Sequence, residues 1–143
     1  MRVVGLDLGE RRIGVAVSDR GGVLAVGHTV LERAADRSAD HAAIAALVAE
    51  LAGECVVVGV PLSLDGTDGP AARAERDEVA DLAGALAVPI ETVDERLTTV
   101  TASRALAAAG VSARGQRRVV DQVAAAVILQ TWLDTKRREE ALP

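Results

Sequence analysis

Three acidic residues stand in surroundings that make a carboxylate costly: Asp7, Glu95 and Asp121. Asp7 interrupts an apolar, strand-like run, Glu95 follows another such run, and Asp121 lies near the start of an apolar, helix-like segment. A carboxylate removed from water needs a charged partner or a metal ion. Mg²⁺ and Mn²⁺ prefer oxygen ligands, and a pair of these ions can activate a water and stabilise the leaving oxygen during phosphodiester cleavage. The three acids therefore predict a Mg²⁺ or Mn²⁺ site for phosphodiester hydrolysis.

Each acid also has a simpler explanation. Asp7 could accept hydrogen bonds from the turn at Gly9-Glu10. Asp121 could interact favourably with the N-terminus of its own helix, and Asp94-Glu95 could be charges at the entry to the next helix. None of the three acids is decisive alone, so the hypothesis requires a fold that brings them together.

Arginines accompany each of the three acids. They are Arg11 and Arg12 after Asp7, Arg96 after Glu95, and Arg114, Arg117 and Arg118 before Asp121. A guanidinium group binds phosphate through a planar fork of donors, so these side chains are candidate nucleic-acid contacts. The group before Asp121 contains a glycine and could instead be an exposed, solvated loop, and Arg96 could equally pair with a neighbouring acid. Because Trp132 is the only aromatic residue, we expect contacts to the backbone and shape of a nucleic acid and not base stacking.

The composition is that of an ordinary folded domain. A length of 143 residues predicts a single domain over residues 1–143. Half of the residues are hydrophobic and one is aromatic, which predicts a core of small aliphatic side chains whose elements approach closely. Cys55 lies in an apolar run and is expected to be a buried thiol. No apolar run is long enough to cross a membrane, so we expect a cytoplasmic protein without a membrane partner.

The apolar periodicity predicts the elements that must position the acids. We expect strands at 2–8, 12–19, 23–31, 55–60 and 89–93, and helices at 38–52, 71–87, from Thr98 or Thr99 to Gly110, and at 117–138. Ser38 or Asp40 is the expected cap of the first helix, and Gly53 its expected end. The connection lengths predict an α/β fold of order βββαβαβαα. Its mixed five-stranded sheet is an antiparallel meander followed by parallel strands, with helices on both faces.

Four motifs in this order resemble the YqgF/RuvX family and together cover essentially the whole chain. They are Asp7-Leu8-Gly9 with Arg11-Arg12-Ile13-Gly14-Val15-Ala16-Val17-Ser18-Asp19, Val57-Val58-Gly59-Val60-Pro61-Leu62 with Asp65-Gly66-Thr67, Asp94-Glu95-Arg96-Leu97-Thr98-Thr99, and Val120-Asp121 ahead of Ala124-Ala125. The first motif departs from the family at one position, because Arg11 stands where a lysine is common. Arginine keeps the charge there but changes its geometry.

The resemblance implies a ribonuclease H-like fold related to the RuvC Holliday-junction resolvases. By position in the motifs, it makes Asp7, Glu95 and Asp121 the ligands of Mg²⁺ or Mn²⁺. It also implies a nuclease that matures the 5′ end of precursor 16S ribosomal RNA, or alternatively one that resolves Holliday junctions, so the partner is structured RNA or branched DNA. Whether Glu95 or Asp94 is the second ligand stays open, because RuvC-type resolvases take that acid from the end of the fourth strand, where this chain has Pro61.

Two other functions compete with this hypothesis. An actin-like kinase or ATPase also begins with an Asp-x-Gly turn, but it needs two such domains and this chain has the length of one. A non-catalytic nucleic-acid-binding domain could keep the fold without the metal, but three crowded carboxylates repel one another in the absence of a cation. The sequence is compatible with a monomer or a weak homodimer.

Overall fold

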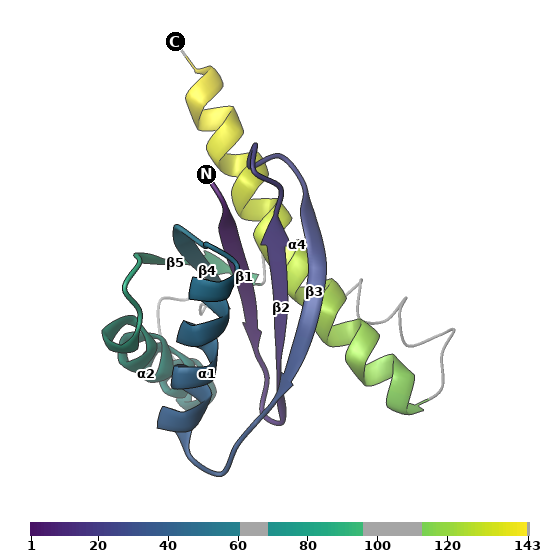
Figure 1. Ribbon diagram of the computed structural model, residues 1–143, viewed down its shortest axis with the longest axis vertical. Coiled ribbons are helices and arrows are strands. Elements are labelled where there is room, and N and C mark those ends of the chain that lie inside the picture. The colour runs from purple at the N-terminus through teal and green to yellow at the C-terminus, as the bar shows by residue number, and fades with distance from the viewer. Residues whose placement is uncertain (61–68, 96–112, 143) are drawn as a thin grey trace.

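The computed structural model describes residues 1–60, 69–95 and 113–142, and it contains one five-stranded sheet (Figure 1). In chain order the elements are β1 (Val3–Leu8), β2 (Arg12–Ser18), β3 (Ala25–Glu32), α1 (Arg37–Glu50), β4 (Cys55–Val60), α2 (Pro70–Ala85), β5 (Ile90–Asp94) and α4 (Ala113–Ala141). The strands lie in the order β3-β2-β1-β4-β5, antiparallel from β3 to β1 and parallel from β1 to β5. The predicted mixed sheet is confirmed, and the helix expected to start at Thr98 or Thr99 lies outside the described residues.

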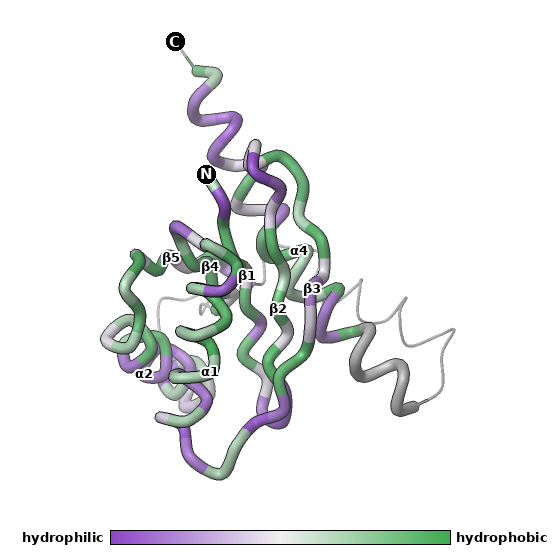
Figure 2. Tube along the Cα trace, viewed as in Figure 1, coloured by the Kyte–Doolittle hydropathy of each residue, from purple (hydrophilic) through white to green (hydrophobic). Residues whose placement is uncertain are grey.

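The two faces of the sheet are covered by different helices. Figure 1 shows α4 crossing one face while α1 and α2 pack on the other. Along β1, Leu6 belongs to the core beneath α1 and α2, whereas Val3 belongs to the core beneath α4. Successive side chains of a strand point to opposite faces, so Gly5 and Asp7 share the α4 face with Val3. Apolar residues dominate β1, β2 and the middle of α4, and polar residues gather near the C-terminal end of α4 (Figure 2).

A glycine allows α4 to lie directly on β1. A Cβ atom at Gly5 would stand 2.7 Å from the Cβ of Leu129 and 3.1 Å from the main-chain oxygen of Ala125. Real Cβ atoms do not approach other atoms so closely, so any larger residue would push the helix away from the strand. The close approach that the small-residue composition predicts is confirmed at this position.

The ends of α1 differ from those expected from the sequence. The N-cap is Asp36, whose side chain accepts a hydrogen bond from the Ser38 amide at 3.0 Å, and neither Ser38 nor Asp40 caps the helix. At the other end, Ala52 adopts the left-handed conformation (φ 55°), and the Gly53 amide donates to the oxygen of Val48 at 2.9 Å. Gly53 has a different reason to be glycine, because a Cβ there would stand 2.9 Å from a methyl group of Val4.

The last helix is longer than its apolar pattern suggests. It begins at Ala113 and not at residue 117, so the segment that could have been a loop is part of α4. Arginine and glutamine are good helix formers and a single glycine costs only about 1 kcal/mol, which explains why this segment continues the helix. In the part of the chain that the structure describes, no helix is both long and apolar enough to cross a bilayer.

Candidate active site

Asp7 lies near the end of β1 with its side chain turned toward α4 and only 4% exposed. The amide of Gly9 donates to the main-chain oxygens of Asp7 at 3.1 Å and of Arg12 at 3.0 Å. These two backbone hydrogen bonds close the turn that follows β1. A carboxylate buried on a strand is stable only with hydrogen bonds or positive charge beside it.

Asp121 comes from the other end of the chain and lies on the helix that covers Asp7. It follows Ala113 by more than two helical turns. The favourable interaction of an acid with a helix N-terminus fades within the first turn, so that simpler explanation of Asp121 is wrong.

Gly14 brings the two aspartates to the same place. It is paired with Asp7 across β1 and β2, so the two residues point to the same face of the sheet. A Cβ atom on Gly14 would overlap the main-chain carbonyl of Asp121, standing 2.7 Å from its carbon and 3.4 Å from the Cα atom. The backbone of Asp121 thus lies directly over Gly14, the neighbour of Asp7 in the sheet.

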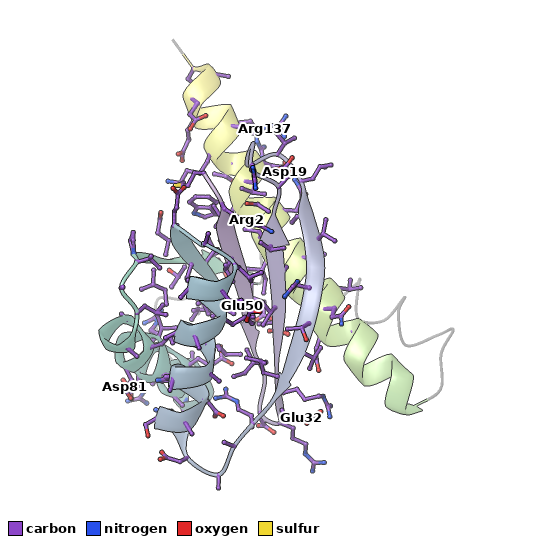
Figure 3. All side chains as sticks on the ribbon, in the orientation of Figure 1. Arg2, Asp19, Glu32, Glu50, Asp81 and Arg137 are labelled. Carbon is purple, nitrogen blue, oxygen red and sulfur yellow. The ribbon has the colours of Figure 1, made fainter. Side chains whose placement is uncertain are left out.

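A cation already accompanies Asp121. The Nε of Arg12, the first residue of β2, lies 2.9 Å from Oδ2 of Asp121, and the two side chains are 20% and 17% exposed. Arg12 is paired with Glu32 across β2 and β3, and Figure 3 shows Glu32 at the end of the molecule opposite Asp19 and Arg137. The candidate site therefore lies toward the Glu32 end of the sheet, beneath α4.

The pairing of β5 shows on which face of the sheet Asp94 lies. Asp94 is paired with Val60, whose side chain lies in the core beneath α1 and α2, on the face opposite Asp7. Val93 packs against the core beneath α4, whereas Glu95 lies beyond the end of β5 in 3₁₀ and not strand conformation, so the alternation of the strand does not extend to it. Glu95 directly follows β5 and is partly buried. The sheet therefore places Asp94 on the face away from Asp7.

The sequence model of one protein family, described as RuvX: Holliday junction resolvase, matches residues 1–135. The chain belongs to the RuvX family. One RuvX relative, from Mycobacterium sp. (strain KMS), is 47% identical over 143 residues, with 99% of this chain and 85% of the relative covered. Another, from Myxococcus xanthus (strain DK1622), is 50% identical over 141 residues, with 96% and 90% covered. Both carry the name "Putative pre-16S rRNA nuclease".

Among solved structures, the RuvX chain is similar to T. thermophilus RuvC in complex with a Holliday junction substrate. The TM-score is 0.60 at 18% sequence identity, and 96% of each chain is covered. At this identity the likeness shows the fold alone. The ribonuclease H-like fold that the four motifs imply is confirmed.

Asp7 and Asp121 fit a divalent cation in their chemistry and in the face of the sheet on which they meet. Carboxylate oxygens are the ligands that Mg²⁺ and Mn²⁺ prefer, and the guanidinium beside Asp121 shows that this position accepts positive charge. Among residues 1–60, 69–95 and 113–142, no three acidic, histidine or cysteine side chains are gathered closely enough to hold an ion. Asp7 and Asp121 come together around Gly14, whereas Glu95 follows β5, which lies two strands away from β1.

The six candidate phosphate-binding arginines have different places in the RuvX fold. Arg11 is exposed on the turn between β1 and β2, and Arg12 is paired with Asp121. Arg114, Arg117 and Arg118 lie in the first turns of α4, where the structure describes the backbone and not the side chains. Arg96 falls outside the described residues.

A buried ionic network holds the β1–β2 turn of this RuvX protein against the helices. The Nε of Arg33 donates to the main-chain oxygen of Gly9 at 3.0 Å, two residues after Asp7. Its terminal nitrogens bind both carboxylate oxygens of Glu78 on α2, at 2.6 and 2.9 Å, and one oxygen of Asp40 on α1 at 3.2 Å. His41 lies 3.0 Å from the same Glu78 carboxylate. No local sequence pattern points to this network, because Glu78 is far along the chain from Arg33, Asp40 and His41.

Glu78 should make the stability of the fold dependent on acid. Burial alone would raise the pKa of Glu78, but the hydrogen bonds from Arg33 and His41 and the arginine charges hold it below its ordinary value of 4.5. A carboxyl whose pKa is lowered by folding adds stability above its unfolded pKa, and that stability is lost as the pH falls through the folded value. Glu78→Gln should lower the free energy of unfolding by about 2 kcal/mol at neutral pH.

Urea denaturation at a series of pH values tests this expectation. The difference in unfolding free energy between the parent and Glu78→Gln should shrink as the pH falls below about 4.5. Asp81→Asn is the matched control, because the Asp81 side chain is 63% exposed and its ion pair with Arg37 contributes little. A constant difference across the pH range would show that the Glu78 charge does not stabilise the fold.

Proposed function

We propose that this chain is a metal-dependent nuclease that hydrolyses phosphodiester bonds of precursor 16S ribosomal RNA during maturation of its 5′ end. Membership of the RuvX family and the names of its relatives support this proposal. The observation that carries it is the convergence of Asp7 and Asp121 on one face of the sheet, around Gly14. We further propose that residues 1–143 act as one domain, in the cytoplasm, as a monomer or a weak homodimer.

The proposed ligands of Mg²⁺ or Mn²⁺ are Asp7, Glu95 and Asp121. Glu95 is preferred to Asp94 because Asp94 is paired on the face of the sheet opposite the two aspartates, whereas Glu95 stands beyond the end of β5. When bound, such ions activate a water and stabilise the leaving oxygen of the phosphodiester. β1 holds Asp7 in one position because both neighbouring strands pair with it, which fixes a ligand before substrate arrives.

The proposed phosphate contacts come from both sides of the metal site. Arg11 stands exposed on the turn that follows Asp7, and Arg114, Arg117 and Arg118 precede Asp121 on α4. Arg12 and Arg96 complete the proposed set. Guanidinium groups can hold the phosphates that flank the scissile bond, which keeps the substrate in line with the metal site.

A cleavage assay on two substrates tests the proposal. Purified protein is incubated with a 5′-extended mimic of precursor 16S rRNA and with a four-way DNA junction, each with Mg²⁺, with Mn²⁺ and with a chelator. We expect cleavage of the RNA only when a divalent ion is present. Symmetric cutting of the junction and not of the RNA would favour resolution of branched DNA. Cleavage that persists in chelator, or in a protein carrying both Asp7→Asn and Asp121→Asn, would overturn the metal site.

A further inference from the structure

We propose that Arg12 is a built-in cation that occupies Asp121 until a divalent metal ion displaces it. This proposal rests on the metal site proposed above. It identifies a residue that controls how tightly that site binds metal. Arg12 and the metal ion would compete for the same carboxylate. The affinity of the site for metal is then set partly by the strength of one ion pair.

The contact between Arg12 and Asp121 occupies one of the two oxygens through which this carboxylate could bind a metal ion. The Nε of Arg12 lies 2.9 Å from Oδ2 of Asp121, a hydrogen bond between two charged groups. A divalent ion bound to that oxygen would meet the guanidinium charge at close range, where like charges repel strongly because both groups are mostly buried. The two cations therefore exclude each other.

The electrostatics of the site explain why a cation is held there. Asp7 is buried, and the backbone of Asp121 packs over Gly14, the partner of Asp7 in the sheet. Two carboxylates brought to one low-dielectric place repel each other, so the metal-free protein is more stable with a positive charge between its acidic elements. Asp121 lies too far along α4 for the helix N-terminus to supply that charge. Arg12 supplies it.

The attachment of Arg12 allows its side chain to leave while its backbone stays. Its main-chain oxygen accepts the amide of Gly9 at 3.0 Å, and its Cα is paired with Glu32, so the backbone is fixed. Within the described residues, the guanidinium forms one ion pair, through Nε. The Arg12 side chain is 20% exposed. Arg33 differs, because it binds both oxygens of Glu78, Asp40 and a backbone oxygen. Once displaced, Arg12 becomes available to a substrate phosphate.

Mn²⁺ titration followed by the electron paramagnetic resonance signal of the free ion tests this competition without measuring cleavage. Arg12→Leu should bind Mn²⁺ about tenfold more tightly than the parent protein, since a hydrogen bond between charged groups contributes about this factor to an equilibrium constant. Arg12→Gln, which keeps polarity but not charge, should also bind more tightly. Arg11→Leu is the matched control, because it removes the same charge from the neighbouring exposed position, and its affinity should change less than about twofold.

Thermal unfolding gives an independent measurement. In chelator, Arg12→Leu should melt at a lower temperature than the parent, because the carboxylates lose their cation. Saturating Mg²⁺ should raise the melting temperature of Arg12→Leu more than that of the parent, since tighter binding to the folded state stabilises it more. If Mn²⁺ affinity is unchanged or weaker in both Arg12 variants, the competition does not exist.

The outcome for the Arg12 variants can be separated from the outcome for the metal site. If Asp7→Asn and Asp121→Asn abolish Mn²⁺ binding but the Arg12 variants bind like the parent, the metal site stands and only the role of Arg12 is overturned. If Asp7→Asn and Asp121→Asn leave Mn²⁺ binding unchanged, the proposed metal site itself is wrong. Tighter binding in the Arg12 and Arg11 variants alike would assign the effect to net charge and overturn the proposal.

Discussion

Asp7→Asn is expected to reduce the rate of RNA cleavage by about 1000-fold or more, because the metal ions contribute several kcal/mol of transition-state stabilisation and this ligand lies at the centre of their site. Asparagine has nearly the same shape as aspartate but carries no charge. The measurement is the single-turnover rate on the 5′-extended RNA at saturating Mg²⁺, which reports cleavage without product release. The melting temperature in chelator should stay the same or rise, because a buried carboxylate is removed from the neighbourhood of Asp121.

Two neighbouring variants make the result specific. Glu95→Gln should also reduce the cleavage rate by a large factor, whereas Asp94→Asn should keep it within about threefold, because Asp94 lies on the opposite face of the sheet. The reverse result would make Asp94 the second ligand. A cleavage rate for Asp7→Asn within about tenfold of the parent would contradict the central position of Asp7.

The sheet was predicted well because strand formation and strand direction depend on local features, namely apolar runs and connection lengths. The short apolar runs at β1 and β4, each followed by turn residues, are typical of strands that are covered on both faces. Short connections between the first three strands require antiparallel pairing, and longer connections through helices allow parallel pairing. The observed antiparallel and parallel pairings agree with these constraints.

The ends of helices were predicted less well because several residues compete for each position. Asp36, Ser38 and Asp40 are all good caps, and the one that caps α1 is Asp36, while Asp40 is recruited by Arg33 from the preceding loop. Ala52 adopts the left-handed conformation that glycine prefers, while a Cβ atom at the neighbouring Gly53 would crowd Val4. Contacts with residues outside the helix therefore influence which residue caps or ends it.

The candidate site, too, was predicted only in part from local sequence patterns. The motifs identified Asp7 and Asp121, but the pairing of Arg12 with Asp121 joins residues far apart in the chain that no local pattern connects. One signal of their proximity was present in the sequence. Gly14 lies in the interior of an apolar strand, where glycine is unfavourable unless another backbone approaches closely. That glycine marks the place where α4 meets β2.

Gly14→Ala is therefore expected to destabilise the protein by about 3 kcal/mol or more, although it adds only one methyl group. The new Cβ would overlap the main-chain carbonyl of Asp121, which cannot turn aside as a flexible side chain can. The strand is paired on both sides, so the strain must displace α4. Urea denaturation measures the loss, and Mn²⁺ affinity should fall with it, because Asp121 moves away from Asp7.

Gly84→Ala provides the matched control for this substitution. Gly84 is in α2, and a Cβ atom there would have nothing within 4 Å. Alanine is the better helix former, so Gly84→Ala should stabilise the protein by about 0.5–1 kcal/mol. The same chemical change thus has opposite expected signs at the two glycines. If Gly14→Ala is as well tolerated as Gly84→Ala, then α4 does not rest on β2 through Gly14, and the convergence of Asp7 and Asp121 loses its structural basis.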